Sequence, residues 1–138
     1  MVIRMNTSSF WGEQTPDPEN DRYLRELQKG YDNEELVKDV VIRQNPWWYL
    51  AGRWATEDED MRGIDFWILH LTMGWFPFQV KSSITGYLKH QSQGDRFVKM
   101  GGSRIPCIIS NQRTSSSEII RQLEYVFDLE MFNRGILF

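Results

Sequence analysis

The stretch at residues 63–83 constrains the fold of this chain more than any other. It contains two short apolar runs, at residues 64–69 and 76–80, and the segment at residues 72–75 between them includes a glycine. Runs of this length and spacing are typical of two antiparallel strands joined by a tight turn. We therefore predict a β-hairpin here.

This apolar hairpin also carries an acid, Asp65, and a cation, Lys81. Strand side chains alternate between faces, so Gln79 and Lys81 project from one side while Phe78 and Val80 project from the other. Burying an ion without a partner costs about several kcal/mol even after the protein relaxes. Folding alone does not explain these residues, which indicates either a functional site or a structural ion pair between Asp65 and Lys81.

Asp65 followed by Gln79-Val80-Lys81 resembles the D…(D/E)xK motif of the restriction-endonuclease-like PD-(D/E)xK nuclease superfamily, in the branch where glutamine replaces the second acid. The resemblance covers residues 33–127, with a helix upstream of the hairpin and a strand and a helix downstream. It implies a metal-dependent nuclease that cuts phosphodiester bonds, and we expect DNA rather than RNA as its substrate.

The resemblance also implies roles for individual residues. Asp65 and Gln79 would be metal ligands together with the backbone carbonyl of Val80, and Lys81 would position or activate the attacking water. Mg²⁺ or Mn²⁺ would be the cofactor, since Mg²⁺ prefers one or two carboxylates plus water and substrate oxygens. Gln79 departs from the acidic pattern and lacks its charge, so metal binding should be weaker.

The family places a further glutamate on the first helix, where this chain has Glu34 and Glu35. Glu34 lies beside the apolar stripe because Val37 and Val41 follow it at helical spacing, whereas Glu35 has Asp39 one turn later, which suggests a more exposed face. We therefore choose Glu34 and keep Glu35 as the alternative. An acid just after the helix cap Asn33 is also favoured by the helix dipole alone.

The rest of the chain predicts an α/β fold, in which a mixed central β-sheet of about four strands is flanked by helices. A helix from residue 20, ended or bent at Gly30 and capped again at Asn33, stops at or before Asn45 because Pro46 follows. Residues 47–56 and 104–110 are predicted as the first and the fourth strand. The four acids at residues 57–60 are predicted as a solvated turn. Alternatively, their charge would help to attract a divalent cation. A capping box at Ser115 and Glu118 starts the last helix, whose apolar stripe would cover the sheet.

The stretch at residues 84–103 has no clear period and is the one markedly basic part of the chain. It is either a flexible solvated loop or a phosphate-binding surface next to the hairpin. The residues proposed to contact nucleic acid are Ser82, Ser83, Lys89, Arg96 and Lys99.

Composition bounds the protein further. The net charge of −3 argues against a chain whose whole surface binds nucleic acid, and the single Cys107 suits a reducing cytoplasm. We expect one domain at residues 20–138 after an arm at residues 1–19, and no membrane span. Phe10 and Trp11 would anchor the arm. The apolar segment at residues 131–138 would pack on this domain or on a second copy in a homodimer.

Two other functions remain open. The chain could be a non-catalytic protein-interaction or nucleic-acid-binding module on the same fold, with Gln79 as a mark of a decayed site. It could also be an unrelated α/β binding domain in which the motif arises by chance. His70 and His90 are too isolated for a zinc site, and Gly101-Gly102 lacks the lysine and hydroxyl residue of a phosphate-binding loop.

Overall fold

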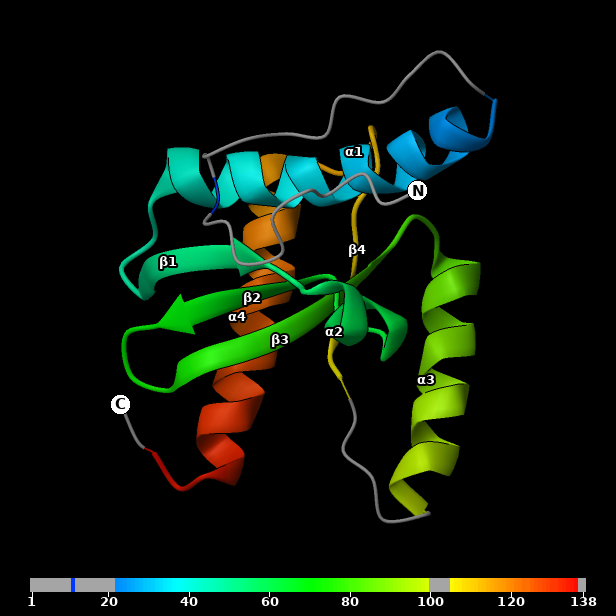
Figure 1. Cartoon of the computed structure of the whole chain (residues 1–138). Coiled ribbons are helices and arrows are strands. Elements are labelled where there is room, and N and C mark those ends of the chain that lie inside the picture. Colours follow the sequence, from blue (N-terminus) through cyan, green and yellow to red (C-terminus); the bar gives the residue numbers. More distant parts are fainter. Residues whose placement is uncertain (1–10, 12–21, 100–104, 137–138) are drawn as a thin grey trace.

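The computed structural model has the α/β architecture that the sequence predicts. It describes Trp11, residues 22–99 and residues 105–136, with the backbone alone at residues 22–31 and 93–99. The elements follow in the order α1 (Arg22–Gln44), β1 (Tyr49–Trp54), α2 (Glu57–Met61), β2 (Phe66–His70), β3 (Gly74–Lys81), α3 (Ile84–Lys99), β4 (Cys107–Ile109) and α4 (Ser116–Asn133). Figure 1 shows α1 and α4 against the sheet and α3 standing beside it.

The four strands form one mixed sheet in the order β1-β2-β3-β4. The β1–β2 and β2–β3 pairs are antiparallel, and β4 joins β3 in parallel after the chain has passed through α3. The predicted hairpin is confirmed, although β3 already begins at Gly74, whose φ of 80° is open to glycine. The register places Phe66 opposite Phe78 and Gln79 opposite Cys107.

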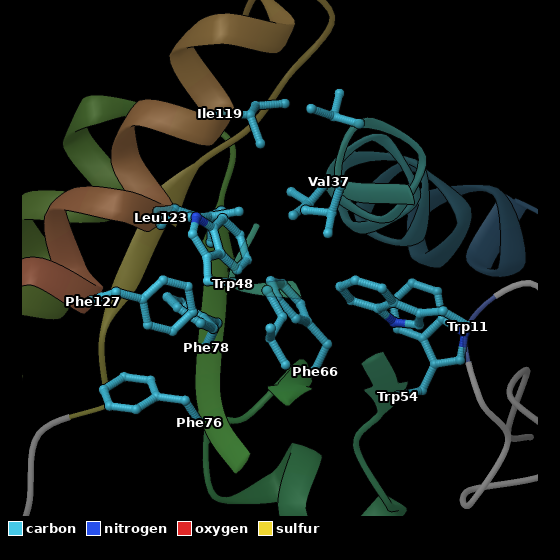
Figure 2. Close-up of a cluster of buried hydrophobic side chains, with 14 of the residues drawn as sticks. Trp11, Val37, Trp48, Trp54, Phe66, Phe76, Phe78, Ile119, Leu123 and Phe127 are labelled. Atoms are coloured by element: carbon cyan, nitrogen blue, oxygen red, sulfur yellow. The ribbon is translucent and has the colours of Figure 1, made fainter. Parts of the chain in front are cut away.

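The apolar stripes of α1 and α4 cover one face of the sheet, as their spacing predicts. Val37, Val40 and Val41 of α1 are buried against the sheet. From α4 the core receives Ile119, Leu123, Phe127 and Met131. Figure 2 shows the rings of Phe66, Phe76, Phe78 and Phe127 gathered with Trp48 between these elements.

Trp11 docks on this core, whereas Phe10 lies outside the described residues. The backbone N–H of Trp11 donates to the Gly52 carbonyl at 3.0 Å. The centroid of the Trp11 ring lies 5.1 Å from that of Phe66 and 5.7 Å from that of Trp54. A Cβ atom at residue 52 would lie 2.3 Å from the Trp11 ring. Only glycine fits at this position of β1.

Three local predictions are wrong. The first helix neither ends at Gly30 nor starts again at Asn33, because α1 runs through both residues without a break. Residues 57–60 belong to the short helix α2 and not to a turn, and residues 84–99 form the helix α3 and not a loop.

Other boundaries agree more closely. The helix α1 ends at Gln44, and Asn45 has a positive φ of 46° just before Pro46. The fourth strand is shorter than predicted, and Arg104 lies outside the described residues. The Ser115 hydroxyl caps α4 by accepting from the Glu118 N–H at 3.1 Å. Of the C-terminal segment, Met131 is buried and Phe132 is exposed.

Candidate functional site

Asp65 is pinned to β3 by both its backbone and its side chain. Its N–H donates to the Phe78 carbonyl at 2.8 Å, and its Oδ2 accepts a hydrogen bond of 2.7 Å from the Val80 N–H. The residue is 9% exposed. A buried carboxylate that accepts a hydrogen bond from a backbone amide keeps a fixed orientation. The acid of the predicted motif therefore lies directly against its Gln79-Val80-Lys81 segment.

Gln79 presents an oxygen that no described residue satisfies. Its backbone N–H donates to the Pro106 carbonyl at 2.9 Å, which fixes the residue between β2 and β4. The Oε1 atom is buried and has no hydrogen-bond partner among the described residues. An unsatisfied buried acceptor costs about 1–3 kcal/mol. Such an atom is the kind of hard oxygen ligand that a divalent cation takes.

Lys81 ends β3 beside the start of α3. Its carbonyl accepts from the Ser110 N–H at 2.9 Å. Its Cβ and Cδ atoms would lie 3.6 and 3.7 Å from a Cβ atom at Gly86, so the aliphatic stem rests against the first turns of α3. A small residue at position 86 leaves room for this stem.

Cys107 reports on the charges around the site. Burial raises the pKa of its thiol to about 12, while Lys81 acts to lower this pKa and Asp65 acts to raise it. Cys107 itself lies opposite Gln79 in the β3–β4 register. The prediction that Cys107 is a buried small hydrophobic residue is confirmed.

The two helix glutamates differ in their surroundings. Glu34 is 8% exposed on the side of α1 that faces the sheet. Glu35 is less deeply buried than Glu34, as predicted, and it forms an ion pair of 2.7 Å with the buried Lys38. The Ser110 hydroxyl donates to the Asn33 carbonyl at 2.9 Å. Because the Ser110 N–H also donates to the Lys81 carbonyl, Ser110 links this turn of α1 to the end of β3.

The predicted nucleic-acid contacts surround the start of α3. Ser82 accepts from the Asn111 side chain at 2.8 Å through its carbonyl, and the Ser83 hydroxyl accepts from the Gly86 N–H at 3.1 Å. Lys89 is exposed on α3. Arg96 and Lys99 belong to the same helix, but their side chains lie outside the described part of the structure.

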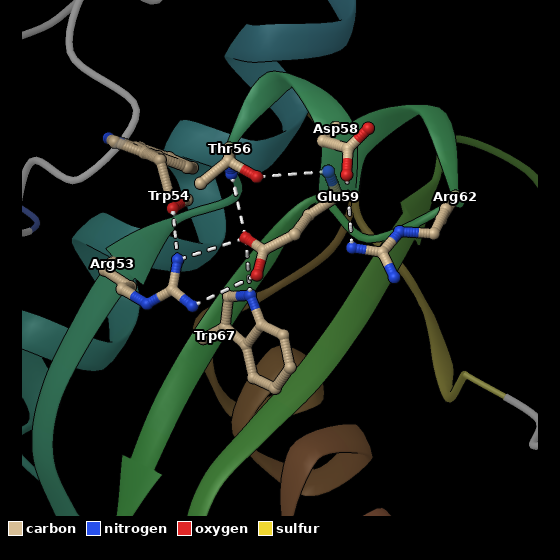
Figure 3. A network of polar contacts seen from close by, with 7 residues as sticks. All are labelled: Arg53, Trp54, Thr56, Asp58, Glu59, Arg62 and Trp67. Atoms are coloured by element: carbon tan, nitrogen blue, oxygen red, sulfur yellow. Dashed lines mark hydrogen bonds and ion pairs between the residues drawn. The ribbon is translucent and has the colours of Figure 1, made fainter.

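Sequence reasoning missed the structural role of Glu59 in the acidic run. Figure 3 shows its carboxylate accepting hydrogen bonds from the Arg53 guanidinium, the Trp67 indole and the Thr56 N–H. Burial opposes ionisation of Glu59, but these hydrogen bonds outweigh it and hold the pKa at about 2. Glu59 therefore braces α2 against β1 and β2. The Thr56–Glu59 capping box was readable in the sequence as T-x-x-E.

The oxygen atoms near Asp65 suit a hard cation in kind. Within the described residues, no group of three or more His, Cys, Asp or Glu side chains could hold a metal ion. The ligands implied by the sequence are the Asp65 carboxylate, the Gln79 amide oxygen and the Val80 carbonyl. Only the first of these belongs to the His, Cys, Asp and Glu side chains just considered. Mg²⁺ accepts few protein carboxylates when water and substrate complete its shell, so this donor set fits it.

The fold and the site define an α/β protein with a polar, partly buried cluster on adjacent strands of a mixed sheet. No protein-family model, curated protein or solved structure matches the chain. No helix in the described part of the chain is both long and apolar enough to cross a membrane.

Proposed function

We propose that the chain is a metal-dependent nuclease that hydrolyses phosphodiester bonds, with DNA as the preferred substrate over RNA. The observation that carries this proposal is the contact between the Asp65 carboxylate and the Val80 N–H at 2.7 Å, which joins the acid to the segment that bears Gln79 and Lys81. The unsatisfied Oε1 of Gln79 supports it, because it is a buried oxygen on that same segment without a hydrogen-bond partner among the described residues.

Each residue has a separate task in this proposal. Asp65, Gln79 and the Val80 carbonyl would hold Mg²⁺ or Mn²⁺. The ion, when bound, would polarise the phosphoryl group and lower the pKa of a water molecule. The Lys81 ammonium would orient the attacking water and offset negative charge on the phosphoryl oxygens. Glu34 is the helix acid that would complete the site, with Glu35 as the weaker candidate because Lys38 engages it.

The test is cleavage of end-labelled duplex DNA, single-stranded DNA and RNA in Mg²⁺ or Mn²⁺, with EDTA as the blank. Cleavage that needs the metal and disappears in Lys81→Ala supports the proposal. Arg62→Ala is the matched control, since Arg62 is an exposed cation that pairs with Asp58 on α2. Equal cleavage by the parent and Lys81→Ala would assign any activity to another site or to a contaminant.

A non-catalytic interaction module is the second candidate, and one observation favours it. An apolar groove of about 550 Å³ lies between α3, β4 and α4. Tyr125 and Leu129 on its wall are exposed, and so is the nearby Phe132. Exposed apolar residues in a row on one helix often mark a contact with another protein or with a second copy. Sedimentation of the chain over a range of concentrations would detect a homodimer.

A further inference from the structure

A polar pocket of about 540 Å³ lies next to the end of β3. Asn33, on its wall, precedes Glu34 in α1, and Ser82 follows Lys81. The pocket therefore adjoins the candidate site through both chain segments. Its other lining residues are Asp32, Asn111, Gln112 and Arg113.

The loop between β4 and α4, which forms one wall of this pocket, is held by side-chain hydrogen bonds. The Asn111 side chain donates to the Ser82 carbonyl at 2.8 Å and accepts from the Arg113 N–H at 2.8 Å. The Asn111 N–H donates to the Thr114 hydroxyl at 3.1 Å. These contacts fix the backbone of Arg113 relative to the strand that carries Lys81.

The guanidinium of Arg113 differs from those of several other arginines. Arg53, Arg62, Arg121 and Arg134 each pair with a carboxylate of the same or a neighbouring element. No ion pair among the described residues involves Arg113, which is exposed at the pocket. A free guanidinium offers a planar set of donors that matches two oxygens of a phosphate.

We propose that this pocket binds a backbone phosphate next to the phosphodiester that is cut, with Arg113 as the positioning residue. The inference rests on the proposed nuclease function, because the phosphate belongs to the same substrate. Asp32, which also lines the pocket, offsets part of the positive charge. Binding must then depend on the paired hydrogen bonds of the guanidinium more than on charge alone.

The experiment measures binding of a labelled oligonucleotide to the full chain in Ca²⁺, between about 50 and 200 mM salt. Arg113→Gln should weaken binding about tenfold or more and lower the slope of log affinity against log salt by about 0.7–0.9, the value for one lost phosphate contact. Arg113→Lys should keep the slope and still lose affinity, because lysine retains the charge but not the paired N–H donors of the guanidinium.

Arg121→Gln is the matched control, since Arg121 is exposed on α4, pairs with Glu118 and lines the apolar groove instead. It should bind as the parent does. In Mg²⁺, Arg113→Gln should raise KM more than it lowers kcat, as expected for a residue that holds substrate without entering the reaction.

The outcomes separate this inference from the proposed function. If the parent binds and cuts nucleic acid while Arg113→Gln keeps the slope and affinity of the parent, the phosphate pocket is wrong and the nuclease stands. If the parent binds without cutting, the nuclease is wrong, and the slope of Arg113→Gln still decides the pocket. Failure of the parent to bind at any salt concentration overturns the inference.

Discussion

The Asp65 carboxylate and the Val80 N–H are joined by a hydrogen bond of 2.7 Å across the β2–β3 pair. This bond aligns the acid with a backbone amide that the strand ladder has already fixed, so its position depends on the hairpin register. A slip of one residue would turn Gln79 and Lys81 to the opposite face of the sheet. The polar cluster and the fold therefore form together.

Gln79→Glu should bind Mn²⁺ about tenfold or more tightly than the parent. The substitution adds a formal charge at nearly constant volume, and the replaced Oε1 atom is buried without a hydrogen-bond partner among the described residues. Without metal the new carboxylate is costly to bury, so the variant should unfold more readily in EDTA and regain stability with the ion. Calorimetric titration and thermal unfolding measure both effects.

Gln91→Glu serves as the control for this prediction, because Gln91 lies on α3 and donates to the Tyr87 hydroxyl. It should leave the Mn²⁺ affinity unchanged. Unchanged or weaker affinity in Gln79→Glu would mean that residue 79 does not face the ion.

Replacement of Lys89, Arg96 and Lys99 by serine should lower the salt slope of DNA binding by roughly two to three units, since each lost phosphate contact removes about one. All three residues belong to α3, which begins directly after Lys81 and Ser83. Binding of a labelled duplex in Ca²⁺ across a salt series is the measurement. If the triple variant keeps the slope of the parent, α3 is an ordinary solvated helix.

The stability of the fold should fall as the pH drops below about 6.5. Burial lowers the pKa of His70 from its ordinary value of 6.5, and the nearby Asp128 opposes this only in part. Nδ1 of His70 accepts from the N–H groups of Thr72 and Met73 at 3.0 and 3.3 Å, so protonation of Nδ1 would remove these two hydrogen bonds of the hairpin turn. The pKa of His70 is lower in the folded than in the unfolded protein. Its contribution to the free energy of unfolding is therefore complete above the pKa of the unfolded state, and it is lost as the pH falls through the pKa of the folded state.

Urea unfolding at several pH values, with the parent beside His70→Asn, tests this contribution. The asparagine keeps an acceptor near the two N–H groups but does not titrate. Its unfolding free energy should change less between about pH 7 and pH 5 than that of the parent. Identical pH profiles would show that His70 does not titrate with unfolding.

Gly52→Ala should destabilise the protein by about 1–3 kcal/mol, the usual cost of overpacking. The added methyl group would lie 2.3 Å from the Trp11 ring, which would have to leave the core. The same substitution made in Trp11→Ala should cost much less, because the opposing ring is gone. A cost of equal size in both backgrounds, measured by urea unfolding, would contradict this packing.

The sequence predicted the elements whose pattern is local and strong. The hairpin and the stripe of Val37, Val40 and Val41 were readable because their apolar periods match their secondary structure. The helix α3 was not predicted, because its polar, glycine-bearing sequence was judged by composition and not by the helical spacing of its few apolar residues; in the structure it packs on β3 and β4. Its placement depends on partners distant in the chain.

The same distinction applies to the candidate site. Asp65, Gln79 and Lys81 were proposed because their motif on two predicted strands resembles that of a known nuclease superfamily. Arg113 was missed because it lies 32 positions beyond Lys81, and the loop reaches the site through contacts of Asn111 with Ser82 and of Ser110 with Asn33. The role of Glu59 was missed because the four acids were judged by charge alone and not by the capping box.

The most direct test of the central claim compares cleavage by the parent, Asp65→Ala and Asp58→Ala on the same labelled DNA, with Mg²⁺ or Mn²⁺ and with EDTA. Asp58 is an exposed acid on α2 and is the charge-matched control. The account predicts metal-dependent cleavage by the parent and by Asp58→Ala, and a loss of at least about a hundredfold in a folded Asp65→Ala, since the metal and the charge it offsets would both be lost. Cleavage by Asp65→Ala at the rate of the parent, or no metal-dependent cleavage by the parent, would contradict it.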